Sequence, residues 1–120
     1  MPEERGLQHH RARIADALRD EIGAIVQGEL GDPRIGLVTV AEVRLAPDGK
    51  NAHVLFSASG SEEEARRSYE GLNAAKGYIR RQLAERLQLR HLPELHFTVD
   101  RAGQGGRIEE LLDRIKKRER

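Results

Sequence analysis

Residues 61–89 read SEEEARRSYEGLNAAKGYIRRQLAERLQL, and this stretch decides the fold. Ser61 followed three residues later by Glu64 forms a capping box, which predicts that a helix begins there. Apolar residues then recur at helical spacing on both sides of residues 74–77. Because a glycine inside a helix costs about 1 kcal/mol relative to alanine, Gly77 favours two helices joined by a kink. The alternative is one unbroken helix in which Gly77 allows close packing.

The kink is expected at Ala75, Lys76 and Gly77. A β-branched residue in place of Gly77 is therefore expected to lower the stability or to change the kink. The buried face of the two helices is expected to consist of Ala65, Tyr69 and Leu72, followed by Ile79, Leu83 and Leu87.

Upstream of this stretch the pattern predicts one helix and one hairpin. Residues 7–30 carry a single apolar stripe at helical spacing, and Gly31 and Pro33 are expected to end that helix. Residues 37–46 alternate as a strand. One face is expected to carry Leu37, Thr39, Ala41, Val43 and Leu45, while Val38 and Val40 suggest that the start of the strand is covered on both sides.

A turn and a second strand follow. The sequence Pro47-Asp48-Gly49-Lys50 is typical of a turn, because proline presets one dihedral angle and glycine tolerates positive φ. The next alternating segment passes through Ala52, Val54 and Phe56, so the two strands are expected to pair as a hairpin.

Downstream of the kinked helices, Leu95, Phe97 and Val99 predict a third strand, and residues 108–115 predict a last amphipathic helix. This order favours an α+β domain of two layers, with helices covering one face of a three-stranded mixed sheet. The crossover between the second and third strands favours a parallel pair. We expect a single domain over residues 1–120, with its core at about 7–115 and a basic, flexible tail at 116–120.

Composition limits the possible chemistry. The chain has no cysteine, which excludes disulfides, thiolate metal sites and cysteine nucleophiles. It contains no apolar run long enough to span a bilayer and no signal-peptide pattern, so a cytoplasmic location is expected. The formal net charge is only +1, but basic residues gather in residues 76–91 and again in residues 114–120. Such asymmetry can steer a polyanion to one side of the molecule, although solvated helix faces would look the same.

The kinked helix between two strands resembles the type II K-homology (KH) fold, whose members clamp single-stranded nucleic acid with a Gly-x-x-Gly loop at the kink. This chain has Ala75-Lys76-Gly77 there, as in the ribosome-binding factor A family, which it resembles over about residues 7–115. The matching stretches include Arg11-x-Arg13-Ile14, Asp32-Pro33-Arg34-Ile35-Gly36, Gly77-Tyr78-Ile79-Arg80-Arg81, Leu95-x-Phe97-x-x-Asp100 and Gly105-x-x-Ile108-x-x-Leu111-Leu112. One departure is Arg101-Ala102, where the family often has a serine and a hydrophobic residue.

The resemblance implies a type II KH-like fold and a ribosome assembly factor. Such a protein binds the small (30S) ribosomal subunit and its 16S rRNA and supports late maturation and rRNA processing. The resemblance also implies a role in growth in the cold and a monomer in solution. We expect no cofactor, no small-molecule substrate and no membrane partner.

The RNA-binding residues are expected to be basic, because phosphate contacts need cations and arginine can donate two parallel hydrogen bonds. The candidates are Lys76, Arg80, Arg81, Arg90, Arg34, Arg13, Lys116 and Lys117, with Arg5, His9, His10 and Arg11 as further possibilities. A salt bridge with Asp32 or Glu29 is the alternative for Arg34, and surface solvation is the alternative for the N-terminal residues. Aromatic residues make up only 3% of the chain, and Phe56 and Phe97 are expected in the core, so phosphate geometry and shape should dominate recognition.

An enzyme is not expected. His9 and His10 are adjacent on a helix and point in different directions, and no third metal ligand is evident. Residues 62–64 are glutamates that suit helix capping better than acid–base catalysis. Two alternatives stay open, a KH-like adaptor whose basic surface binds an acidic protein, and a protein that binds another structured RNA. Competition by RNA would distinguish the adaptor.

Overall fold

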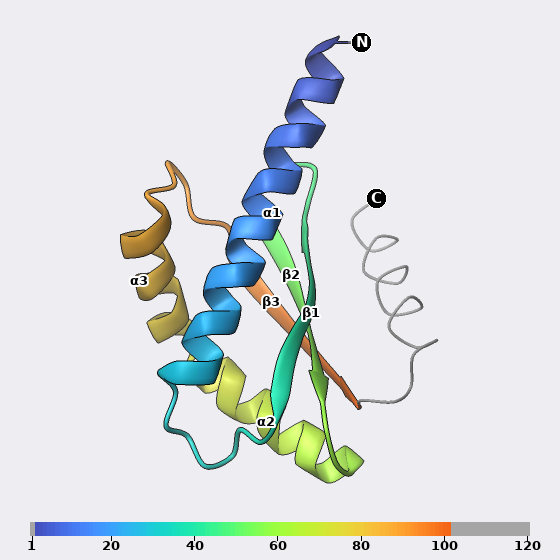
Figure 1. Cartoon of the computed structure of the whole chain (residues 1–120), viewed down its shortest axis with the longest axis vertical. Helices are drawn as coiled ribbons and strands as arrows, with labels where there is room; N and C mark the ends of the chain where they lie inside the picture. The colour runs from blue at the N-terminus through green and yellow to red at the C-terminus, as the bar shows by residue number, and fades with distance from the viewer. Residues whose placement is uncertain (1, 102–120) are drawn as a thin grey trace.

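The computed structural model describes residues 2–101, with side chains from residue 9 onward. The elements are α1 (Pro2–Gly28), β1 (Val38–Leu45), β2 (Asn51–Ala58), α2 (Glu62–Ala74), α3 (Lys76–Leu87) and β3 (Glu94–Arg101) (Figure 1). The strand order in the sheet is β1-β2-β3, with β1 and β2 antiparallel and β2 and β3 parallel. The predicted α+β architecture with a three-stranded mixed sheet is thus confirmed. The predicted last helix at 108–115 and the tail with Lys116 and Lys117 lie outside the described residues, and the single-domain organisation stays a prediction.

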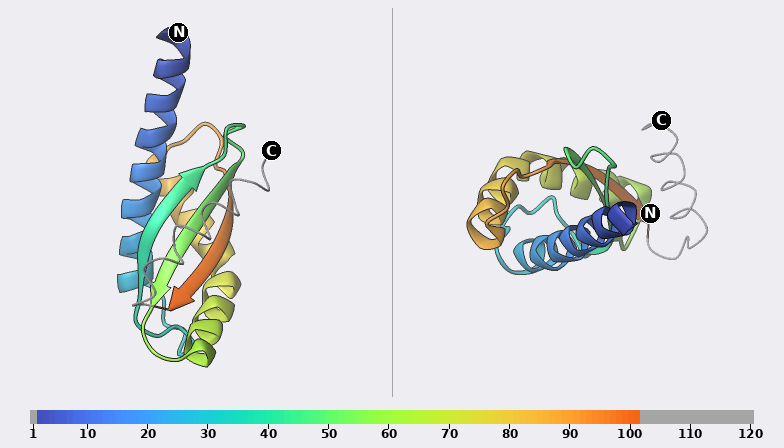
Figure 2. Two further views of the ribbon diagram at one scale, coloured as in Figure 1. Left: turned by 90° about the vertical axis from the view of Figure 1, so that its right-hand side faces the viewer. Right: turned by 90° about the horizontal axis from the view of Figure 1, so that it is seen from above.

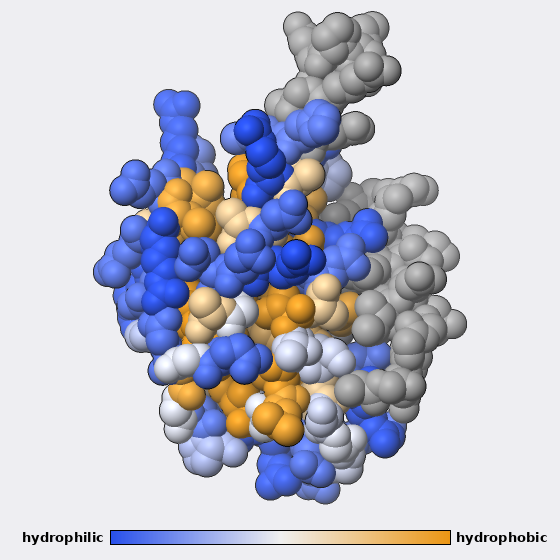
Figure 3. Space-filling view, in the orientation of Figure 1, coloured by the Kyte–Doolittle hydropathy of each residue, from blue (hydrophilic) through white to orange (hydrophobic). Residues whose placement is uncertain are grey.

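All three helices lie on one side of the sheet, as the two views of Figure 2 show. The core between the layers includes Phe56 and Phe97, whose rings meet edge to face with centroids 5.4 Å apart. The two phenylalanines are therefore core residues, as predicted. Hydrophilic side chains cover most of the outward faces of α1 and α3 (Figure 3). The helices contribute Leu18, Ile22, Ile25, Leu72, Ile79 and Leu83 to the core, each fully buried.

The first helix is displaced from the predicted residues 7–30. It begins at Pro2, a residue type that is favoured in the first helical turn because its missing N–H would have no partner there. It ends at Gly28, because glycine has a low helix propensity. The amide of Glu29 makes the last helical hydrogen bond, to the Ile25 carbonyl. Leu30 then packs against the core from outside the helix.

The prediction for the faces of the first strand is wrong. The pairing of β1 with β2 shifts between Val40 and Glu42, which is a β-bulge at Ala41. After the extra residue, each side chain points to the opposite face of the sheet from the one that strict alternation predicts. Val38 and Val43 are therefore both buried. Leu37, which precedes the strand, is 81% exposed, and Thr39 is also exposed.

Helix α2 begins as predicted but buries a different set of residues. The Ser61 side chain accepts the Glu64 amide hydrogen at 3.1 Å, and the Glu64 carboxylate accepts the Ser61 amide hydrogen at 3.2 Å, which confirms the capping box. Tyr69, expected in the core, is 40% exposed. Ser68 is buried instead, and its hydroxyl accepts a hydrogen bond from the Gly36 amide at 3.1 Å. The loop before β1 therefore docks on α2 at Ser68.

The predicted kink is present, but glycine does not cause it. Helix α2 ends at Ala74, Ala75 has φ −85° and ψ 0°, and α3 begins at Lys76. Gly77 lies inside α3 without a positive φ, and a Cβ atom there would meet no heavy atom within 4 Å. The structure therefore shows no steric reason for a β-branched residue at Gly77 to change the kink, because the break lies at Ala75, two residues earlier.

Replacing Gly77 with alanine is expected to leave the stability unchanged or to raise it by up to about 1 kcal/mol, because alanine loses less backbone entropy in a helix. Urea unfolding followed by circular dichroism measures this. A clear loss of stability in Gly77→Ala would mean that the kink depends on glycine after all.

Candidate nucleic-acid interface

The kink places a helix N-terminus at the surface. No side chain caps the N-terminus of α3, whose preceding residue is Ala75. The first N–H groups of any helix have no partner within it, and the helix dipole makes this end attractive to anions. Gly77 is exposed and carries no side chain to cover these groups. The start of α3 thus has no side-chain cap and an exposed glycine, and the helix dipole favours an anion there.

Lys76 is held beside this N-terminus. Its Nζ atom lies over the Phe97 ring, 5.4 Å from the ring centroid, and the residue is partly buried. The aliphatic part of the side chain therefore packs toward the core while the ammonium group stays at the surface. A cation–π contact of this kind limits the positions that the ammonium group visits.

Arg80 and Arg81 follow in the next turn. Arg81 is exposed, whereas Arg80 is partly buried and its Nε atom has no hydrogen-bond partner within the part of the chain that the structure describes. Neither arginine, nor Lys76, forms an ion pair with a residue in the described range 2–101. Three of the predicted contact residues thus lie together beside the kink and form no ion pair with a carboxylate of the described residues.

A groove between α2 and the edge strand β3 opens near this cluster, and we call it the α2–β3 groove. Its volume is about 420 Å³. Phe97 lines the groove and is also the residue beneath Lys76, so the groove leads toward the start of α3. Its lining consists of Glu62, Ala65, Arg66 and Tyr69 from α2 and of residues 97–101 from β3.

Three of the polar residues in this groove were not predicted as contact residues from the sequence. Tyr69 offers an exposed ring and hydroxyl, although its spacing had placed it in the core. Arg66 and Arg101 add guanidinium groups, each held by a loose ion pair, to Glu63 at 3.4 Å and to Glu62 at 3.9 Å. The only available signal was the type of residue 69, because tyrosine is often placed with its ring buried and its hydroxyl exposed.

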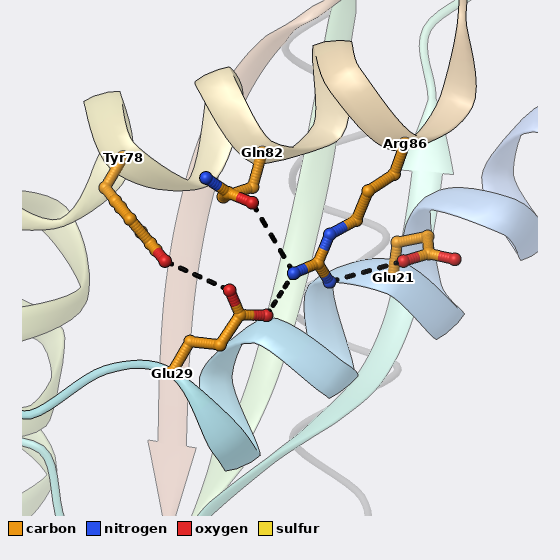
Figure 4. Close-up of polar contacts among 5 residues, drawn as sticks. All are labelled: Glu21, Glu29, Tyr78, Gln82 and Arg86. Carbon is orange, nitrogen blue, oxygen red and sulfur yellow. Dashed lines mark hydrogen bonds and ion pairs between the residues drawn. The ribbon is translucent and has the colours of Figure 1, made fainter.

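Arg86, which contributes to the basic cluster in the sequence, forms surface contacts that join α3 to α1 (Figure 4). Its guanidinium donates to the Glu29 carboxylate and, at 3.5 Å each, to Glu21 and Gln82. Tyr78 donates its hydroxyl hydrogen to the other oxygen of Glu29 at 3.0 Å. One side of α3 therefore joins α1, and the side with Lys76, Arg80 and Arg81 is left for other contacts.

The pKa shifts of Glu29, Arg86 and Tyr78 follow from these hydrogen bonds. The hydrogen bond from Arg86 lowers the pKa of Glu29, and the same contact raises the pKa of Arg86. The hydrogen bond to Glu29 raises the pKa of Tyr78. All three groups therefore keep their ordinary charge state at neutral pH, and the link between α1 and α3 is an ion pair supported by a phenol.

Arg34 is paired with Asp32, which is one of the two alternatives that the sequence allowed. Arg34 Nη2 lies 2.6 Å from Asp32 Oδ2, and Arg34 Nε lies 3.0 Å from Oδ1. Hydrogen bonds from the Arg34 side chain and backbone lower the pKa of Asp32 to about 2. The guanidinium is still partly exposed, so the ion pair fixes its position without burying it.

The Asp32–Arg34 pair predicts a pH dependence of stability. Because the folded-state pKa of Asp32 is lower than its ordinary value of 3.8, the pair stabilises the fold above that value. This contribution is lost as the pH falls toward about 2. We expect Asp32→Asn to be less stable than wild type near neutral pH, with a difference that shrinks through this acidic range. Urea unfolding at a series of pH values measures it, and a constant difference would show that the ion pair contributes nothing.

Arg90 and Arg13 lie apart from the kink, whereas Lys116 and Lys117 lie outside the described residues. Arg90 is exposed in the loop after α3, and α3, whose twelve residues span about 18 Å at the helical rise per residue, lies between it and Lys76. Arg13 is exposed on α1. Among the described candidates, Lys76, Arg80 and Arg81 thus lie beside the kink, and Arg90 and Arg13 lie elsewhere.

Two other kinds of site are absent from the described residues. Within this range no group of three or more histidine, aspartate or glutamate side chains is arranged to hold a metal ion. Among the helices of the described part, none is both long enough and apolar enough to cross a bilayer.

A kinked helix pair packed on a mixed sheet, in the order helix, strand, strand, helix, helix, strand, defines a type II KH-like domain. Residues 10–112 match the family model described as ribosome-binding factor A. Ribosome-binding factor A of Koribacter versatilis is 57% identical over 119 residues, covering 98% of this chain and 97% of that protein. This chain therefore belongs to the ribosome-binding factor A family.

Solved structures agree with this assignment. The crystal structure of ribosome-binding factor A from Thermus thermophilus is similar with a TM-score of 0.66 at 32% identity, covering 74% of this chain and 93% of that one. A homology model of the Thermus thermophilus protein, fitted into a cryo-EM map of its complex with the 30S subunit, gives a TM-score of 0.57 at 33% identity. That match covers 70% of this chain and 88% of the other.

Proposed function

We propose that this protein binds the small (30S) ribosomal subunit through its 16S rRNA and supports late maturation of the subunit and processing of that rRNA. Two findings support the proposal. The chain belongs to the ribosome-binding factor A family, and a similar protein from Thermus thermophilus has been fitted into a map of a 30S complex.

One structural observation supports the choice of the kink as the RNA-contacting surface. Lys76, Arg80 and Arg81 lie beside an uncapped helix N-terminus and form no ion pair within the described residues. Cations that form no ion pair within the described residues, next to an uncapped helix N-terminus, suit the phosphates of an RNA backbone. Binding releases the counterions of these phosphates, so the affinity should fall steeply with salt.

The contact surface extends in our proposal from the kink into the α2–β3 groove. Tyr69 offers a ring on which an unstacked base can lie, and Arg66 and Arg101 flank it. Shape and phosphate geometry still dominate recognition, because Tyr69 is a single platform. Arg90, Arg13, Arg34, Lys116 and Lys117 remain proposed as secondary RNA contacts.

The proposed role requires no catalysis by this chain. The family is one of ribosome-binding factors, and we infer that the protein acts by binding alone. We also place it in the cytoplasm, where ribosomal subunits mature.

The proposal is tested by co-sedimentation of the purified protein with small subunits, large subunits and assembled ribosomes over a salt series. We expect selective association with free small subunits that weakens as salt rises. Equal association with all three particles, or none with small subunits at low salt, would contradict the proposal.

The adaptor alternative keeps the same basic surface but assigns it to an acidic protein. Both modes are electrostatic, so salt dependence alone does not separate them. Competition with protein-free 16S rRNA does: RNA that displaces the protein from small subunits supports the rRNA contact, and failure to compete favours a protein partner.

A further inference from the structure

A cavity of about 780 Å³ lies at the end of the molecule remote from the kink. We call it the hairpin-end pocket. It lies where the β1–β2 turn and the loop from α3 to β3 meet the N-terminal half of α1. Its volume is within the range of about 300–1,000 Å³ that is typical of ligand pockets. The lining consists of His10, Arg11, Ile14, Leu45, Pro47, Asp48, Gly49, Lys50 and residues 88–93.

The floor of the pocket is apolar and fixed. Ile14, Leu45, Leu89 and Leu92 are partly buried and pack against the core, so their exposed parts form a continuous edge of it. In Figure 3 apolar surface shows at the upper left of the molecule, between α1 and the end of α3, with hydrophilic side chains around it. A flat apolar group can cover this surface and remove it from water.

The walls are tied to one another by hydrogen bonds. The Glu94 amide donates to the Lys50 carbonyl at 2.8 Å, which joins the α3–β3 loop to the hairpin. Gly49, with φ +72°, and the Asp48 side chain close the turn, the latter by accepting the Lys50 amide hydrogen at 2.8 Å. Arg11 reaches the Pro47 carbonyl at 3.4 Å. The pocket therefore exists before any ligand binds.

The rim of the pocket is basic. Arg11, Lys50 and Arg90 lie on it, and none of the three forms an ion pair within the described part of the chain. Asp48 is the one carboxylate of the lining, and it is already engaged by the Lys50 amide. A ligand that combines an apolar part with more than one negative charge therefore matches this pocket.

We propose that the hairpin-end pocket holds a single unstacked nucleotide of the small-subunit rRNA. The base lies on the apolar floor, and the phosphates on its two sides lie at Arg11, Lys50 and Arg90. Proteins read RNA mostly at loops and bulges, where such bases can leave the stack. An apolar peptide segment would fill the floor but leave three cations without counter-charge. This proposal rests on the proposed function and adds a second contact, remote from the kink.

The first test replaces two rim cations, in Lys50→Gln/Arg90→Gln, and measures the affinity for purified small subunits over a salt series. We expect the slope of log affinity against log salt to fall by about two, because two phosphate contacts are lost. The matched control is Arg19→Gln/Arg44→Gln, which removes two exposed arginines that lie outside this pocket and outside the α2–β3 groove. A slope equal to that of wild type in the rim variant would overturn the proposal.

The second test uses the absence of cysteine from the chain. His91→Cys places a single thiol on the rim for attachment of a short photocrosslinker. Crosslinks from the small-subunit complex to one short segment of 16S rRNA would support the proposal, and crosslinks to a ribosomal protein would overturn it. Failure of wild type to bind small subunits at all would contradict the proposed function, so the two failures are distinguishable.

Discussion

Arg80→Glu/Arg81→Glu is expected to bind small subunits about 100-fold more weakly than wild type. Two arginines that form no ion pair within the described residues are replaced by groups that repel phosphate, and each lost contact reduces affinity about tenfold. The fold should stay intact, because neither residue lies at the centre of the apolar stripe of Ile79 and Leu83. Part of the Arg80 side chain is buried, so urea unfolding of the double variant accompanies the binding measurement. Equilibrium binding of the labelled protein to purified small subunits measures the effect.

Arg19→Glu/Arg44→Glu provides the control, because it makes the same change in net charge at two exposed arginines away from the kink. It should bind within a few-fold of wild type. If both variants lost affinity equally, net charge rather than the kink would determine binding. If neither lost affinity, the RNA-contacting surface would lie elsewhere.

Gly71→Val is expected to destabilise the protein by about 1–3 kcal/mol, which is typical of overpacking in a core. A Cβ atom at Gly71 would lie 2.6 Å from Ile35 Cγ1 and 3.4 Å from Arg34 Cβ. The loop that carries these residues is held to the same helix by the hydrogen bond from Gly36 to Ser68. A side chain at Gly71 must therefore displace the loop before β1. Urea unfolding measures the loss.

The same substitution at Gly77 provides the control, because a Cβ atom there meets nothing within 4 Å. Gly77→Val should leave the free energy of unfolding close to the wild-type value. Equal losses at the two positions would show that β-branching in a helix, and not contact with Ile35, causes the destabilisation.

Most of the helices and strands could be predicted from short-range sequence patterns. The capping box at Ser61 and the turn at Asp48 each involve contacts between residues a few positions apart, so a single sequence contains the information. The bulge at Ala41 could not be foreseen, because alternation of apolar residues does not show where one strand has an extra residue relative to its partner. The kink was predicted in the right place for an incorrect reason, since Gly77 has neither a positive φ nor a close neighbour.

The candidate site depends more on contacts between distant residues. Arg86 and Arg81 are five residues apart on one helix and look alike in the sequence. Only the packing of α3 on α1 shows that Arg86 forms an ion pair with Glu29, while the likewise exposed Arg81 forms none within the described residues. The hairpin-end pocket joins segments of α1, a turn and a loop that no sequence motif connects. The sequence thus shows which residues are basic, but it does not show which of them are left free of internal ion pairs to contact RNA.

A crosslink from the kink tests the central proposal, that the face formed by α2, α3 and the kink contacts the rRNA of the small subunit. Gly77→Cys introduces a single thiol at an exposed position with open space around it, and Asp20→Cys on the outer face of α1 is the control. After attachment of a short photocrosslinker and binding to small subunits, we expect crosslinks to 16S rRNA from position 77 and far fewer from position 20. Crosslinks from position 20 alone would contradict the proposed interface.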